Sequence, residues 1–220
     1  MNPETEIEAQ RVHVEVPAAE LEHEAWEKAP SVFITHYWSG EVAPIGRHAE
    51  ARLIWSDEAL CVRFVCRQNE PLVVNRAPLL DRKAIGLWDR DACEIFIAPD
   101  ALRPERYFEF EAAPTGEWLD LRIHWMPDGR ETDWDFQSGM TTAARIAECE
   151  ITIAMRLPWE GFGMLTPPHA GERWLVNLFR CIGAEEEDAG RGYLAWQPTR
   201  TARPNFHVPE AFGWLCFKDG

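Results

Sequence analysis

The chain has 220 residues, of which 46% are hydrophobic and 27% are charged, a composition typical of a globular protein rather than a disordered or collagen-like one. Its 37 acidic and 22 basic side chains give a formal net charge of -15, which argues against nucleic acid and membrane partners. No linker, repeat or composition break divides the sequence, so a single domain over residues 1–220 is expected.

The first fifteen residues contain four glutamates and lack the basic and apolar regions of a secretory signal. As the sequence is written, the protein is therefore expected to be cytoplasmic; a start site further upstream would make export the expectation. The six cysteines form no C-x-x-C pair, and most lie within apolar runs, so reduced thiols in the core are expected.

Short apolar or alternating runs recur along the chain with turn residues between them, and no long stretch keeps the 3.6-residue period of a helix. The clearest predicted strands span residues 49–55, 59–67, 92–98, 106–112, 118–125, 149–157 and 173–182. Turns are expected at residues 114–116 and 127–129, and one helical turn is expected at Pro158. This pattern predicts an all-β fold, a two-sheet antiparallel β-sandwich of jelly-roll or immunoglobulin-like type.

Alternation along three neighbouring predicted strands separates apolar from polar side chains. If these strands pair, one sheet face carries Glu94, Tyr107, Glu109, Glu111, Trp118, Asp120, Arg122 and His124. Two interpretations remain open for such a face: an ordinary solvated surface with cross-strand ion pairs, or a binding surface.

Eleven tryptophans exceed the usual share, and a single core does not accommodate all of them. Trp88 lies in the polar run Gly-Leu-Trp-Asp-Arg-Asp, and Trp196 lies in Tyr-Leu-Ala-Trp-Gln-Pro. Indole rings beside carboxylate, guanidinium and amide groups suit sugars, because the C–H faces stack on the ring while hydroxyls form hydrogen bonds. The tryptophans therefore favour the binding interpretation.

Several segments together resemble the family 9 carbohydrate-binding modules and the wider group of DOMON-like sandwiches. They span residues 51–60, 87–97, 107–110, 114–116, 158–159, 171–174 and 204–213, and the most specific is the W-x-x-D-x-x-E-I-F pattern that begins at Trp88. The resemblance implies a jelly-roll-like sandwich that clamps a sugar, often a terminal unit, between two tryptophans. It identifies Trp88 and Trp196 as the clamp and Glu94 as an acidic hydrogen-bonding residue.

The chain departs from the resemblance at Glu109, which occupies a position where sugar-binding members tend to carry arginine. Arg122 or Arg180 is expected to supply the missing guanidinium, with Tyr107 and Glu109 as further contacts. Some members hold structural Ca²⁺, but no twelve-residue calcium loop is present, so no cofactor is assigned and Ca²⁺ is left open. The expected partner is a carbohydrate: a monosaccharide, an oligosaccharide or the end of a polysaccharide.

Three other functions were weighed against sugar binding. Glu94 and Glu109 resemble the paired carboxylates of a glycosidase, yet no hydrolase motif accompanies them, so no catalysis is expected. Haem binding is the second alternative, since DOMON-like sandwiches include b-type cytochromes; the candidate ligands are His36, His124, His207 and Met126. The third is a protein-interaction domain that uses the same aromatic surface.

Overall fold

The computed structural model describes residues 5–184 and 191–220, and within them all regular structure is strand or short 3-10 helix. The strands are β1 (Glu6–Arg11), β2 (Val32–Ile34), β3 (His36–Tyr37), β4 (Ala49–Trp55), β5 (Ala59–Arg67), β6 (Ala92–Ala98), β7 (Arg106–Ala112), β8 (Trp118–Met126), β9 (Gly129–Asp133), β10 (Thr141–Ile146), β11 (Glu150–Pro158), β12 (Arg173–Ile182), β13 (Gly192–Ala195) and β14 (Gly213–Lys218). The helices are η2 (Glu24–Lys28), η3 (Ile45–Arg47), η4 (Leu87–Asp89), η5 (Trp159–Phe162) and η6 (Pro209–Ala211).

The predicted strands agree closely with the structure. β4, β5, β6, β7 and β12 have the predicted bounds, β8 is one residue longer, and β11 is shifted by one residue. The two predicted turns join β7 to β8 and β8 to β9, and η5 follows Pro158. Strong local patterns therefore define the middle of the chain.

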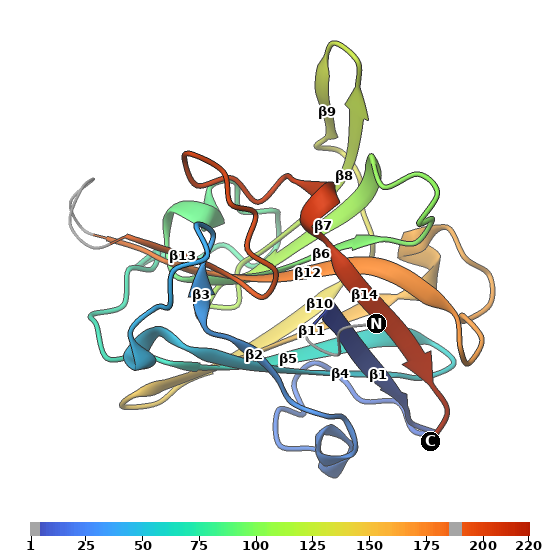
Figure 1. The fold of residues 1–220 in the computed structure, drawn as a ribbon. Helices are drawn as coiled ribbons and strands as arrows, with labels where there is room; N and C mark the ends of the chain where they lie inside the picture. The colour runs from blue at the N-terminus through green and yellow to red at the C-terminus, as the bar shows by residue number, and fades with distance from the viewer. Residues whose placement is uncertain (1–4, 185–190) are drawn as a thin grey trace.

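The strands form two stacked layers, and the all-β sandwich is confirmed (Figure 1). One layer runs β10-β11-β5-β4, with β2 beside β4; the other runs β12-β6-β7-β8-β9, with β13 beside β12. β1 and β14 lie between β4 and β12 and connect the layers into one hydrogen-bonded network. The expected all-antiparallel pairing needs one correction: β1 runs parallel to both β4 and β14, because it joins the two layers along one edge.

Apolar side chains from the inner faces of both layers form the main core, which includes Phe64, Ile95, Phe110, Met155 and Trp174. These five side chains are almost completely buried. All six cysteines are unpaired, and Cys149 alone among them is exposed. The expectation of reduced core thiols therefore agrees with the structure for the other five.

A second apolar cluster lies on the outer face of β6, β7 and β8. It contains Phe96, Tyr107 and Leu121, and Phe206 and Phe212 cover it from the segment before β14. This outer face is therefore not the open solvated surface that strand alternation left as one interpretation. The part of the chain that the structure describes has no helix with the length and apolar character needed to cross a membrane.

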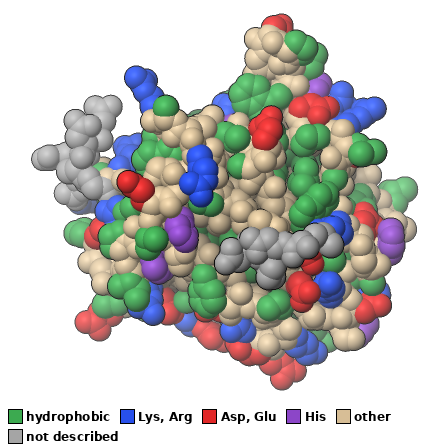
Figure 2. All heavy atoms as spheres, viewed as in Figure 1, with side chains coloured by type: hydrophobic (Ala, Val, Ile, Leu, Met, Phe, Trp, Pro, Cys, Tyr) green, Lys and Arg blue, Asp and Glu red, His purple; other side chains and the backbone are tan. Residues whose placement is uncertain are grey.

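Two features mark the outside of the sandwich. The β8–β9 hairpin stands out from the body of the sandwich, at the top of Figure 1. Basic and acidic side chains are interleaved over the lower part of the surface seen in Figure 2, where η2 and β4 lie in the ribbon view. Charges of both signs thus share that part of the surface.

Candidate functional site

A cavity of about 470 Å³ opens beside the outer face of β6, β7 and β8. Its lining comes from well-separated parts of the sequence: Trp88, Glu94, Phe96, Glu109, Leu121, Arg130, Thr132, Trp134, Tyr193, Pro204, Asn205, Phe206 and His207. The volume falls within the range of cavities that bind small molecules. The lining combines five aromatic rings besides His207 with several polar groups, and this makes it the candidate site.

The strand register places the acidic and apolar side chains on one face. Glu94 lies opposite Glu111, and Phe96 lies opposite Glu109, across the β6–β7 pair. Glu109 in turn lies opposite Leu121 on β8. Directly opposed residues in an antiparallel pair share a face, so these side chains all point toward the covering segment of residues 204–212.

Three carboxylates form the floor of the site and are almost completely withdrawn from solvent. Glu94 is 2% exposed, Glu109 is 3% exposed and Glu111 is fully buried. One oxygen from each lies within 4.8 Å of the others. Both oxygens of Glu111 and Oε2 of Glu109 have no hydrogen-bond partner outside the contact between these two carboxyl groups. Since buried polar groups are normally paired, this floor has unused capacity to accept hydrogen bonds.

Burial shifts the ionisation of the three acids toward the neutral form. It raises the pKa of Glu94 to about 8, with a further contribution from the charge of Glu109. Burial also raises the pKa of Glu109 to about 7, and it raises that of Glu111 well above the ordinary value. The Cys181 thiol donates a hydrogen bond to Glu94 Oε1 at 3.0 Å.

A chain of hydrogen bonds positions His207 above Glu109. The indole Nε1 of Trp125 donates to the Tyr107 hydroxyl at 3.3 Å, and that oxygen lies 2.8 Å from His207 Nδ1. His207 Nε2 lies 3.8 Å from Glu109 Oε2. Burial, together with the charge of Arg130, lowers the pKa of His207 to about 3, so the imidazole is neutral at neutral pH.

Aromatic rings form the walls. Trp88 comes from η4, Tyr193 from β13, and Trp134 follows β9. Trp134 is 44% exposed and stands at the edge of the cavity beside the hairpin residues Arg130 and Thr132. The site thus has a carboxylate floor, aromatic walls and one guanidinium at its rim.

Three of the predicted site residues, Trp88, Glu94 and Glu109, line the cavity. Tyr107 does not line it, but its hydroxyl lies 2.8 Å from the lining residue His207. The structure thus places these four side chains in or next to the cavity.

Arg122, Arg180 and Trp196 lie away from the cavity, which corrects their expected placement. Arg122 is 60% exposed on the other face of β8 and pairs with Asp133 at 2.6 Å. Arg180 is buried on the opposite face of β12 from Phe179, and its guanidinium donates to Arg47 O and Gln68 Oε1. Trp196 packs against the main core.

The error at Arg122 has a physical cause. Apolar side chains on β8 were expected to face the inner core, but Leu119, Leu121 and Ile123 belong to the outer cluster. The covering segment makes the outer face apolar as well, so polarity alone does not tell the two faces of β8 apart.

Sequence reasoning missed several lining residues, including Trp134, Arg130, Asn205 and Tyr193. A signal for one of them was present, because Trp134 lies in the run Thr-Asp-Trp-Asp, as polar as the run around Trp88. His207 was named only as a haem ligand candidate, yet it contributes a neutral imidazole to the floor.

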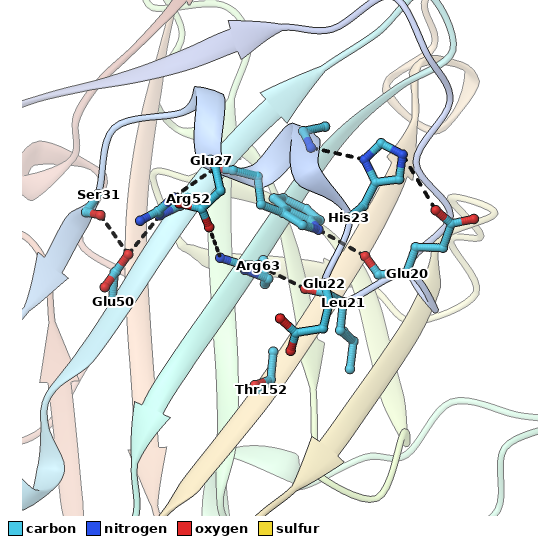
Figure 3. A network of polar contacts seen from close by, with 12 residues as sticks. Glu20, Leu21, Glu22, His23, Glu27, Ser31, Glu50, Arg52, Arg63 and Thr152 are labelled. Carbon is cyan, nitrogen blue, oxygen red and sulfur yellow. Dashed lines mark hydrogen bonds and ion pairs between the residues drawn. The ribbon is translucent and has the colours of Figure 1, made fainter.

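A second polar cluster lies on the other layer, under η2 (Figure 3). Arg52 donates to Glu50 at 2.8 Å and to Glu27 at 2.7 Å, while Arg63 donates to Leu21 O at 2.8 Å. The Arg63 guanidinium also stacks on the Trp26 ring at 5.3 Å. Opposite charges meet here, so this cluster fastens η2 to the sheet.

Comparison with known proteins gives a consistent result. A family model described as "Carbohydrate family 9 binding domain-like" matches residues 19–219. A solved structure described as a carbohydrate-binding protein from Bacteroides uniformis has a TM-score of 0.76 at 17% identity, and the match covers 97% of this chain and 99% of that one. No curated protein matches the chain.

Two further solved structures are of a family 9 carbohydrate-binding module from Caldicellulosiruptor kristjanssonii. The complex with glucose has a TM-score of 0.67 at 14% identity and covers 98% of this chain and 96% of that one. The complex with cellotriose has a TM-score of 0.65 at 15% identity and covers 98% and 94%. At these identities the likeness establishes the fold.

Proposed function

Because this chain belongs to the carbohydrate family 9 binding domain-like family, we propose that it binds a saccharide, without transforming it, in the cavity beside β6, β7 and β8. The ligand is a monosaccharide or the terminal unit of a longer glycan. The observation that carries the proposal is the meeting of aromatic rings and buried hydrogen-bonding groups in one small cavity.

The walls suit the apolar face of a sugar ring. Trp88 and Trp134 offer indole surfaces, and Tyr193 offers a third ring. A pyranose presents patches of C–H groups that pack on such rings, and aromatic residues provide a large contact area with few rotatable bonds. We assign stacking to Trp88 first, with Trp134 taking the role once expected of Trp196.

The floor suits the hydroxyl groups of the sugar. Glu94 and Glu109 accept hydrogen bonds, while Asn205 and His207 offer amide and imidazole groups beside them. A ligand that forms hydrogen bonds with the buried polar groups of the cavity binds more tightly, whereas a ligand that leaves them without partners binds more weakly. Directional bonds of this kind give selectivity among sugars of similar size.

The position of the carboxylates argues against glycoside cleavage. A glycosidase places its two acids on either side of the scissile bond. Glu94 and Glu109 lie on paired neighbouring strands and on the same sheet face, so both would approach a sugar from one side. Such an arrangement binds and orients hydroxyls.

The test is titration of the purified protein with monosaccharides and short oligosaccharides, followed by calorimetry and tryptophan fluorescence. Trp88→Ala should weaken the tightest-binding sugar at least tenfold, about 1.4 kcal/mol, with little change in melting temperature. Trp214→Ala on β14, outside the cavity, is the matched control and should bind normally. Absence of heat and of fluorescence change with every sugar contradicts the proposal.

A further inference from the structure

Acidic groups outnumber basic groups around the cavity floor. Three carboxylates gather there, and Arg130 at the rim is the one Lys or Arg among the described residues that line the cavity. His207, the other basic side chain in the lining, is neutral. The floor therefore lacks a cation of its own.

The oxygens of this floor also have few donors. Oε2 of Glu109, which lines the cavity and is 97% buried, and both oxygens of Glu111 behind it have no hydrogen-bond partner outside the contact between these two carboxyl groups. His207 Nε2 lies 3.8 Å from Glu109 Oε2, beyond hydrogen-bond distance. Buried acceptors in this state favour a ligand that brings both hydrogen-bond donors and positive charge.

Either a metal ion such as Ca²⁺ or an ammonium group could bind to such a cluster, and the side chains around the cluster favour the ammonium group. A calcium ion takes six to eight oxygen ligands. Beside the three carboxylates lie the Phe96 and Leu121 side chains and the Cys181 thiol, and the neighbouring backbone belongs to the β6–β7 and β7–β8 ladders. A primary ammonium needs only three acceptors, which the cluster provides, and it is attracted by aromatic rings such as those of the walls.

We propose that the cavity selects sugars that carry a free amino group, of the glucosamine type, and that Glu94 and Glu109 hold the ammonium with Glu111 behind them. This inference rests on the proposed function, since the same walls hold the sugar ring. It narrows the ligand from saccharides in general to amino sugars.

The protonation of the floor carboxyl groups before a ligand binds supports the preference for amino sugars. With pKa values of about 8 and 7, Glu94 and Glu109 hold protons near neutral pH. An ammonium stabilises the ionised carboxylates, so its binding lowers both pKa values and expels protons. Affinity for the amino sugar should therefore rise as the pH rises from 5 to 7, where the amine still keeps its own proton.

Other titratable or charged groups face the floor from the elements packed against it: Tyr107 on β7, Cys181 on β12, Tyr193 on β13, Arg130 on β9, His207 in the covering segment and Asp89 in η4. Burial raises the pKa of Tyr107 and of Cys181, so both stay protonated near neutral pH. His207 stays neutral there because its pKa is lowered to about 3. The carboxylates thus account for the expected pH dependence.

The experiment compares glucosamine, N-acetylglucosamine and glucose by calorimetry at pH 7 in the presence of a chelator. Glucosamine should bind at least tenfold more tightly than the other two. Repeating its titration in phosphate and in HEPES, which differ in ionisation enthalpy, should show proton release, whereas glucose should show none.

The variant Glu109→Gln should weaken glucosamine about tenfold and reduce its advantage over glucose. Glu131→Gln on exposed β9, the matched removal of one negative charge outside the cavity, should leave that advantage unchanged. Proton release by the unmodified protein tests the same idea without any variant.

Each contrary outcome has its own meaning. Glucose binding as tightly as glucosamine overturns the amino-sugar inference and leaves the proposed function intact. Failure of every sugar to bind overturns the proposed function. Heat from CaCl₂ alone that Glu109→Gln abolishes identifies the cluster as a metal site and overturns the inference.

Discussion

The two layers of the sandwich each carry buried or half-buried charges on their outer face, under a covering segment, but they treat those charges differently. On β4 and β5, the cations Arg52 and Arg63 meet Glu27 and Glu50 under η2 (Figure 3). On β6 and β7, three acids meet without a cation among them. Matched charges indicate a structural cluster, whereas buried acids with raised pKa values and no cation beside them indicate a binding site.

Removal of a cation from the matched cluster should have the largest effect on stability. Arg63→Ala leaves the Leu21 carbonyl without its donor, removes the weaker of the two ion pairs of Glu27 and removes the stacking on Trp26. We expect a loss of about 3 kcal/mol in the free energy of unfolding, measured by chemical denaturation.

The sugar affinity of Arg63→Ala should not change, because the cluster lies on the other layer from the cavity. A loss below about 1 kcal/mol, or a change in affinity, would contradict the division between the two faces.

Replacement of an acid in the cluster of Glu94, Glu109 and Glu111 by a neutral side chain should stabilise the protein, the opposite of the effect of Arg63→Ala. The raised pKa of Glu111 means that the folded protein holds a proton which the unfolded chain releases above its ordinary pKa, so this group destabilises the fold as the pH rises. Glu111→Gln should therefore raise the free energy of unfolding measurably at pH 8.

The gain from Glu111→Gln should shrink toward pH 4, where the acid is protonated in both states. Denaturation curves at pH 4, 6 and 8 measure it, with exposed Glu131→Gln as the control that should change little. A destabilised Glu111→Gln at pH 8 would show that the carboxylate is needed by the fold.

The smallest expected effect concerns the edge of the cavity. Trp134 is 44% exposed, so Trp134→Ala should change the free energy of unfolding by less than about 0.5 kcal/mol. It should weaken sugar binding about fivefold, or about 1 kcal/mol, by calorimetry. Unchanged affinity would remove Trp134 from the site and leave Trp88 as the stacking surface.

The sequence alone predicted the middle strands well because alternation and turn residues are local signals. Strand alternation placed Glu94 and Glu109 on one face, and the resemblance to family 9 modules added Trp88 to the same site. The sequence did not predict β1 or β14, whose pairing joins the two ends of the chain, and it did not predict the covering segment that makes the outer face apolar. The misplaced Arg122 follows from that segment, which no local pattern connects to β8.

Trp196 and Trp134 show that tertiary packing, which no local pattern reveals, decides whether a tryptophan side chain is buried or accessible. Both lie near the end of a strand and were open to a binding role by composition. Trp196 packs so closely under β14 that a Cβ added at Gly213 would lie 2.5 Å from its ring. Trp134 lies beyond a projecting hairpin, where its ring stays accessible.

The parallel pairing of β1 with β14 also has a mechanical consequence. Five residue pairs, from Glu6 with Trp214 to Gln10 with Lys218, align along these two strands. Because the strands are parallel, tension between the start of β1 and the end of β14 pulls them past each other lengthwise. All hydrogen bonds of the pair then carry the load together instead of opening one after another, so this edge of the sandwich should resist extension as a shear clamp.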